Sequence, residues 1–233
     1  SIWKHTMGYF NPTAGILANA YGLEPNTVPK YSVNVDSIMN FIGFEKVLLN
    51  NRSVKLNKGI YLDFNAIAKG YCVDLLSNAL KKNNITNHLI EIGGEMYASG
   101  INNITNTRWK VGISDPLKPD DTKQKIFLKN IALASSGNYR KFLIDPETGV
   151  KIVHTINPNN GSANQTNILA SSVIAENCMT ADAYATAFMA MPLDKSISLI
   201  NDDKSLDGMI IYFDSNNEIQ TYYSSGFKKL IFD

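Results

Sequence analysis

The residues of this chain that could carry out chemistry fall into four short blocks. The blocks are residues 62–70 (LDFNAIAKG), 91–95 (EIGGE), 154–158 (HTINP) and 181–186 (ADAYAT). Together they supply carboxylates, a glycine turn, one imidazole and an Asp/Thr pair on a predicted helix. Oxygen ligands suit a hard cation, and unpaired backbone N–H groups suit a phosphate, so the blocks indicate a site for both.

The last block holds a candidate metal site. Asp182 and Thr186 lie four residues apart at the start of a predicted helix, so both side chains project from one face. A carboxylate and a hydroxyl supply two ligands for Mg²⁺, and water or phosphate oxygens complete the octahedron. The structural alternative is an acidic side chain in the first turn that complements the helix dipole, and for such a pair alone this is the commoner case.

The first block reads as a strand that ends near Asp63 and turns into a helix. Such turns expose unpaired N–H groups that bind anions, and the Ala66 carbonyl could also face a cation. Lys69 lies in the first turn, where the helix dipole disfavours a positive charge, so a bound phosphate would explain it. The alternative is a lysine that extends into solvent.

The other two blocks have equally ordinary alternatives. Gly93 and Gly94 follow a predicted strand and fit neither a phosphate-binding P-loop nor a dinucleotide motif, so they are either a tight turn or amides that face a ligand. His154 becomes an acid or base only if a phosphate ester lies beside it, and is otherwise structural.

Composition limits the function classes. The chain has 233 residues, 44% of them hydrophobic and 18% charged, with a net charge of +1. This balance gives no broad field for nucleic acid, and no stretch approaches the roughly 20 apolar residues of a membrane span. Cys72 and Cys178 are far apart, which argues against a zinc or redox motif. The chain begins with Ser1 and no leader, so we expect an upstream segment to be missing.

The periodicity predicts one domain over residues 1–233, with an α+β fold of mixed, largely antiparallel sheets and flanking helices. Asp36 is the predicted cap of its helix, and Asn50-Asn51 the predicted positive-φ turn of a hairpin. Predicted helices are 16–21, 36–41, 67–82, 181–189 and one that begins near Pro192. Predicted strands are 46–49, 53–56, 60–64, 89–92, 109–114, 126–133, 142–144, 168–175, 209–213, 219–222 and 229–232. The helix over 67–82 is expected to bury Tyr71, Leu75, Leu76, Ala79 and Leu80 on one face.

Six blocks in order resemble the ApbE-like flavin transferases, which are magnesium-dependent enzymes that use FAD. The family pattern reads approximately GxFDPTxG, LDLGAIAKGYAVD, GGDIxAxG, SGDY, HIIDPxTG and ADAxATA. The corresponding segments here are GYFNPTAG (8–15), LDFNAIAKGYCVD (62–74), GGEMYASG (93–100), SGNY (136–139), HTINPNNG (154–161) and ADAYATA (181–187). The match runs from about residue 6 to the C-terminus.

The resemblance implies a role for each matching residue. The implied metal site is the Ala66 carbonyl, Asp182 and Thr186, with Ala185 beside it. His154 and Asp182 are the implied catalytic residues, and His154 would assist proton transfer. The implied FAD contacts are Tyr9, Phe10, Asn11, Asp63, Asn65, Lys69, Gly93, Gly94 and Ile156.

The implied reaction splits the pyrophosphate of FAD with the help of Mg²⁺. FMN is transferred to a threonine of an acceptor protein, a subunit of a redox complex, and AMP leaves. The alternative is a pyrophosphatase in which water attacks and free FMN and AMP result. Family members are exported, so we expect a periplasmic or membrane-anchored protein whose lipid signal lies in the missing segment. No nucleic-acid partner is expected.

Three family acids are replaced by asparagine here, at Asn11, Asn138 and Asn157. This motivates a second alternative, a relative that binds FAD but has weakened catalysis. A third is a generic α+β domain in which the blocks are coincidental.

Overall fold

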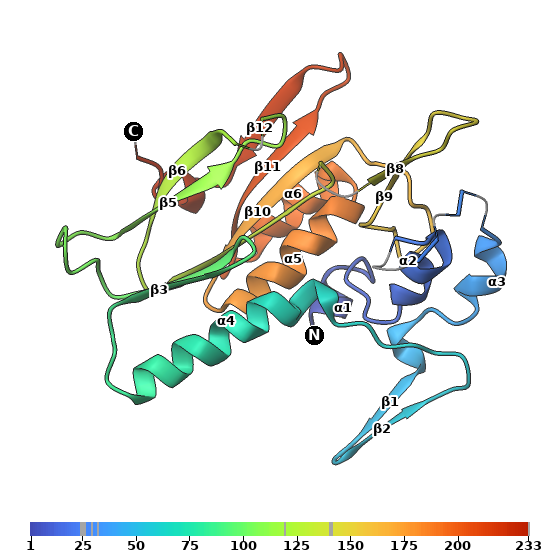
Figure 1. The fold of residues 1–233 in the computed structure, drawn as a ribbon, viewed down its shortest axis with the longest axis horizontal. Helices are drawn as coiled ribbons and strands as arrows, with labels where there is room; N and C mark the ends of the chain where they lie inside the picture. The colour runs from blue at the N-terminus through green and yellow to red at the C-terminus, as the bar shows by residue number, and fades with distance from the viewer. Residues whose placement is uncertain (24–26, 29, 32, 119, 140–141, 233) are drawn as a thin grey trace.

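A six-stranded antiparallel sheet forms the centre of the molecule (Figure 1). The computed structural model describes residues 1–23, 27–28, 30–31, 33–118, 120–139 and 142–232. Strands follow the order β12-β11-β10-β7-β4-β3, and all their described pairings are antiparallel. The strands are β3 (His88–Ile92), β4 (Glu95–Ser99), β7 (Ile131–Gly137), β10 (Ile168–Ala175), β11 (Asp207–Phe213) and β12 (Ile219–Tyr223). The predicted α+β class with a largely antiparallel sheet is thereby confirmed.

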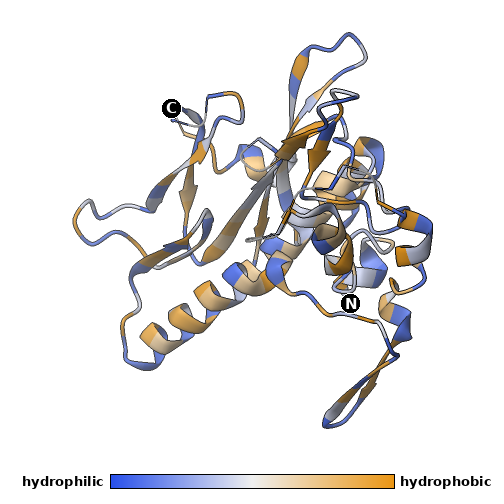
Figure 2. Cartoon of the chain, turned by 45° about the vertical axis from the view of Figure 1, so that its right-hand side comes forward, coloured by the Kyte–Doolittle hydropathy of each residue, from blue (hydrophilic) through white to orange (hydrophobic). Residues whose placement is uncertain are grey.

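Each face of this sheet carries its own hydrophobic core, because successive side chains of a strand point to opposite faces. On β7, Ala132 and Ala134 belong to one core and Leu133 to the other. The small alanines let helices pack closely on the first face. Figure 2 shows the hydrophobic residues gathered on these central strands.

Helices cover the first face. The helix α5 (Cys178–Ala190) packs on β7 and β10, and α4 (Asn65–Lys82) packs on β3, β4 and α5. The helix α6 (Leu193–Asp202) lies beside β11. The second face is covered by β5 (Trp109–Ser114), β6 (Thr122–Leu128) and α7 (Ser225–Lys228). Sequence-distant α4 and α5 are therefore neighbours, which brings the first and last chemical blocks together.

The N-terminal residues and a small hairpin build a third core. The helices α1 (Ile2–His5), α2 (Gly15–Tyr21) and α3 (Val35–Met39) precede the 3-10 turn η1 (Phe44–Lys46). The hairpin is β8 (Phe142–Ile144) with β9 (Lys151–Val153). Leu17 and Tyr21 of α2 pack with Ile152 and Ile156, so the 154–158 block is held next to the N-terminal segment.

One hairpin projects from the body (Figure 1). It consists of β1 (Val47–Asn50) and β2 (Ser53–Leu56), and among the described strands these two pair only with each other. Leu49 is 70% exposed and Val54 54% exposed. We call residues 47–56 the arm.

Three predicted strands differ in the structure. Residues 60–64 form no strand, and the Asp63 N–H instead donates to the Pro12 carbonyl at 2.7 Å. The segment 126–133 is two strands, because the chain reverses at Asn130, whose φ is +54°. Residues 229–232 contain only an isolated bridge from Ile231 to Ile126, next to α7.

Two turn predictions were also wrong. The cap of α3 is Asn34, whose side chain accepts from the Ser37 N–H, and Asp36 lies inside the first turn. The two-residue loop of the arm is Asn51-Arg52, one position later than predicted, because Asn50 pairs with Ser53; neither Asn50 nor Asn51 has positive φ.

The predicted buried face of α4 was wrong as well. Tyr71, Leu75 and Leu76 are about half exposed, whereas Gly70, Val73 and Ser77 are buried. The close packing of α4 on α5 selects the face with the smallest side chains, and periodicity favoured the largest ones. Within the described residues, no helix is long and apolar enough to cross a membrane.

Candidate active site

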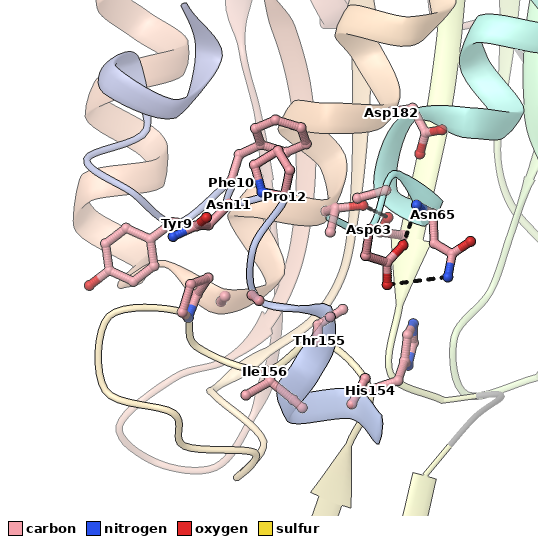
Figure 3. A pocket seen from close by; sticks show the side chains of 18 of the residues that line it. Tyr9, Phe10, Asn11, Pro12, Asp63, Asn65, His154, Thr155, Ile156 and Asp182 are labelled. Carbon is pink, nitrogen blue, oxygen red and sulfur yellow. Dashed lines mark hydrogen bonds between the residues drawn. The ribbon is translucent and has the colours of Figure 1, made fainter. Parts of the chain in front are cut away.

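A cavity of about 510 Å³ lies where the N-terminal segment, the start of α4, the 154–158 block and α5 meet (Figure 3). Many of the residues predicted to bind metal, FAD or protons line it. These are Tyr9, Phe10, Asn11, Asp63, Asn65, Ala66, Lys69, His154, Ile156, Asp182 and Thr186. Gly93, Gly94 and Ala185 are not among the described lining residues. Their functional roles stay predictions.

Asp63 organises the entry into α4. Its Oδ1 accepts from the Asn65 N–H at 2.7 Å, and its Oδ2 accepts from the Asn65 side-chain amide at 3.4 Å (Figure 3). This Asx turn gives a partner to one of the unpaired N–H groups at the start of α4, whose N-cap position is Phe64. The turn therefore holds Asp63, Asn65 and Ala66 at the cavity wall.

Asp182 is a buried carboxylate of the site, with 2% of its surface exposed. Its Oδ2 accepts from the Gly70 N–H at 3.0 Å. Burial raises the pKa of Asp182 to about 7; the Gly70 hydrogen bond opposes this shift, the charge of Glu95 adds to it, and the charge of Lys69 opposes it. A neighbouring cation would favour the ionised form of this carboxyl.

The structure argues against the helix dipole as the reason for an acidic side chain at Asp182. The helix α5 begins at Cys178, three residues earlier than predicted, and Asn177 caps it by accepting from the Thr180 N–H. The first turn contains no acidic residue, so Asp182 does not lie where the dipole is strongest. Thr186, one turn later, also lines the cavity, with its Oγ1 3.4 Å from Ser136 Oγ.

The Gly93-Gly94 turn connects β3 to β4 and has positive φ at both residues, +60° and +102°. The Gly94 N–H donates to Glu91 Oε1 at 2.7 Å, and the Gly93 carbonyl accepts from Lys69 Nζ at 3.4 Å. Glycine is needed here for the backbone conformation. The turn thus contacts the site through Lys69.

The 154–158 block contributes His154, Thr155, Ile156 and Pro158 to the cavity wall. Figure 3 shows the His154 ring near Asp63 and Asn65. The ring therefore lies at the cavity wall, and its role in proton transfer stays a prediction.

The three asparagines that replace family acids all use an oxygen as hydrogen-bond acceptor. Asn11 Oδ1 accepts from the Thr13 N–H and hydroxyl at 3.0 and 2.7 Å. Asn138 Oδ1 accepts from the Thr155 hydroxyl at 2.7 Å, and Asn157 Oδ1 accepts from the Asn159 N–H at 2.9 Å. An aspartate could accept the same bonds, so the replacements change charge but keep these contacts.

Three residues of the predicted blocks had no individual role assigned to them from the sequence. Glu95 and Ser136 line the cavity, and Gly70 carries the N–H that binds Asp182. Glu95 stood at the edge of the 91–95 block, but no periodicity or spacing links it to α4. The strand pairing that places β4 beside α4 was needed to find it.

The fold and the cavity define an α+β protein with two buried carboxylates, Asp182 and Glu95, and with a hydroxyl and a lysine at the same cavity. The family model of the ApbE family matches residues 1–210. The chain belongs to the ApbE family, as the ordered blocks predicted.

Comparison with individual relatives supports the same family assignment. The FAD:protein FMN transferase of Haemophilus influenzae is 31% identical over 97% of this chain and 67% of its own length. That of Vibrio cholerae is 29% identical over 97% of this chain and 68% of its own. The structure of the flavin transferase ApbE from Vibrio cholerae superposes with a TM-score of 0.86, at 26% identity, over 98% of this chain and 73% of that one.

Proposed function

We propose that this chain is an enzyme that transfers FMN from FAD to an acceptor protein. The relatives that cover nearly all of this chain are named for that reaction. The observation that carries the proposal is the buried Asp182 carboxylate, held by Gly70 in a cavity that also contains Lys69 and Thr186.

The donor set fits Mg²⁺. Asp182, Thr186 and the Ala66 carbonyl offer one carboxylate, one hydroxyl and one carbonyl oxygen, which are hard ligands. Among the described residues, no three His, Cys, Asp or Glu side chains are placed to hold a metal ion together, so a cation here would also need the hydroxyl and carbonyl oxygens. The raised pKa of Asp182 also fits, because a divalent cation offsets the cost of burying its charge. When bound, Mg²⁺ would neutralise phosphate charge as a Lewis acid.

The chain's own residues supply binding and proton transfer. Lys69 would pair with a phosphate, while Tyr9, Phe10 and Ile156 provide apolar surface for the flavin or adenine ring. The hydroxyl of an acceptor threonine attacks the phosphorus of the FMN half, and the bond to the AMP phosphate breaks. His154 takes the proton of that hydroxyl, and AMP leaves. If water attacks instead, the products are free FMN and AMP.

The test incubates the protein with FAD, Mg²⁺ and an acceptor domain that contains a candidate threonine. Covalent, fluorescent acceptor is expected, and Asp182→Ala should reduce the rate by at least about a hundredfold, because charge compensation at the phosphates is lost. Chelation of Mg²⁺ should do the same. Free FMN and AMP without labelled acceptor would assign a pyrophosphatase. Binding of FAD without turnover would assign a relative with weakened catalysis.

We further propose that the acceptor is a subunit of a redox complex and that the reaction takes place outside the cytoplasm, with the enzyme periplasmic or anchored to the membrane. These proposals rest on the family resemblance. Fractionation of cells that express the full gene product, followed by detection of flavin-labelled proteins in each fraction, tests both.

A further inference from the structure

Glu95 is a buried charge whose role neither the motif nor the comparisons define. It begins β4 directly after the Gly93-Gly94 turn, and only 1% of its surface is exposed. Burial raises its pKa, and Lys69 opposes that shift. A buried carboxylate costs several kcal/mol unless it is paired, so its retention at the cavity wall needs an explanation.

Its partner is Lys69. The two atoms of the ion pair, Lys69 Nζ and Glu95 Oε2, are 2.5 Å apart. Apart from this ion pair, Oε2 accepts no hydrogen bond from the residues that the structure describes. The Gly93 carbonyl gives the same ammonium a second contact at 3.4 Å. The start of β4 and the turn before it therefore hold the end of Lys69.

The rest of Lys69 is not held in the same way. Its side chain is 46% exposed although its ammonium touches a buried group. A lysine with four rotatable bonds at such a position normally extends into water and has about 2 kcal/mol of side-chain entropy to lose when it is fixed. The ion pair instead keeps the ammonium at the cavity wall, where its charge acts on Asp182.

We propose that Glu95 is a positioning residue, which holds the Lys69 ammonium at the cavity wall so that it meets a phosphate of the dinucleotide on arrival. This inference rests on the proposed function, because it takes FAD as the ligand. Glu95 lies at the cavity wall, and the role assigned to it here is exerted through Lys69. Preorganisation of this kind increases affinity by removing the cost of ordering a flexible side chain.

The test is a double-mutant cycle on FAD binding, read from the quenching of flavin fluorescence. Glu95→Gln keeps the shape and removes the charge, and we expect about tenfold weaker binding of FAD. In a Lys69→Met background the same change should alter the dissociation constant less than twofold. Glu95→Asp, one methylene shorter, should recover part of the loss. Glu176→Gln removes an exposed carboxylate and serves as the matched control.

Folding is monitored in parallel, because Lys69→Met alone leaves Glu95 buried and unpaired. The double variant removes both charges and should unfold at a higher temperature than Lys69→Met alone. An equal loss of FAD affinity from Glu95→Gln in both backgrounds, or no loss in either, would overturn the proposal.

A second readout needs no FAD. Acylation of lysines, followed residue by residue with mass spectrometry, should modify Lys69 several-fold faster in Glu95→Gln than in the wild-type chain, with other lysines unchanged. If FAD does not bind the wild-type chain but this difference appears, the positioning stands and the proposed function fails. If the Lys69 rate does not change, the positioning is wrong even where FAD binds.

Discussion

At the scale of single residues, the environment of Asp182 gives the clearest evidence for a binding role. It is buried, accepts one backbone N–H and has a pKa raised to about 7. Its position in the second turn of α5 removes the helix dipole as a sufficient reason for an acid here. The carboxylate destabilises the chain when it is ionised without a cation, which is the behaviour expected of a binding group.

This predicts an unusual pH dependence of stability. The folded pKa of Asp182 lies above its unfolded value of about 3.8, so the folded chain binds more protons between these values. Stability from this group is therefore full below about pH 4 and is lost as the pH rises to about 7. Without divalent cations, the loss should amount to about 2–4 kcal/mol.

Asp182→Asn isolates the effect, because the amide oxygen can still accept from Gly70. The free energy of unfolding, measured with urea at pH 4, 5, 6 and 7, should fall less steeply for this variant than for wild type. Added Mg²⁺ should reduce the pH-dependent loss of unfolding free energy that wild type shows at pH 7 relative to Asp182→Asn. Parallel curves for the two proteins would mean that Asp182 does not titrate in this range.

At the scale of elements, the contact between α4 and α5 assembles the site. Gly70 permits it: a Cβ at this position would lie 2.4 Å from the Cys178 carbonyl oxygen. The same close approach lets the Gly70 N–H reach Asp182. A single small residue therefore determines both the packing of two helices and the position of a carboxylate.

Gly70→Ala should consequently destabilise the chain although alanine favours helices by about 1 kcal/mol. The clash is with backbone, so the expected net loss is about 2 kcal/mol, together with weaker FAD binding as the Gly70 N–H moves away from Asp182. Chemical denaturation and FAD titration measure the two effects. Cys72→Ala, on an exposed position of the same helix, should change stability by less than about 0.5 kcal/mol. An unchanged or more stable Gly70→Ala would show that the helices separate without cost.

The sequence was sufficient to predict most helices and strands. It was insufficient to predict which faces are buried and which strands pair, because tertiary packing determines these. The helices at α2, α4, α5 and α6 and most strands of the sheet lie close to their predicted ranges. The buried face of α4 was missed because glycine and serine carry no hydrophobic signal. Residues 60–64 look like a strand, but no strand within the described part of the chain pairs with them.

The candidate site shows the same division. Ordered motifs indicated Asp182, Thr186 and Ala66, which line one cavity. The part played by Glu95 depends on β4 lying beside α4, and strand order cannot be read from spacing. The family resemblance is confirmed, whereas the roles assigned to individual residues await the experiments above.

At the scale of the whole molecule, the body has three layers: the helices on the first face, the central sheet, and the β5–β6 hairpin with α7 on the second face. The arm makes few packing contacts with this body. Val47 at the base of the arm is buried, but Leu48, Leu49, Val54 and Leu56 are exposed. An isolated two-stranded hairpin is marginally stable in water. The arm should therefore open locally far more often than the body unfolds.

Limited trypsin digestion should reveal this. The first cleavages of the 233-residue chain are expected after Arg52 and Lys55, in the arm, before any cleavage in β5 or β6. Mass spectrometry of early time points identifies the sites, and the nicked fragments should remain associated through the body. Early cleavage within the β5–β6 hairpin (residues 109–128) would instead mean that this hairpin opens more easily than the arm.

The hydrogen bond between Gly70 and Asp182 also has a consequence for the order of folding. Its two residues are 112 positions apart, and closing a flexible loop of that length costs about 4 kcal/mol of chain entropy beyond a constant term. Contacts of such long range slow folding. During synthesis, the segment with Asp63 and Lys69 leaves the ribosome long before its partner exists. The cavity therefore cannot form before the chain has been synthesised through α5, and ligand binding reports that α4 and α5 have come together.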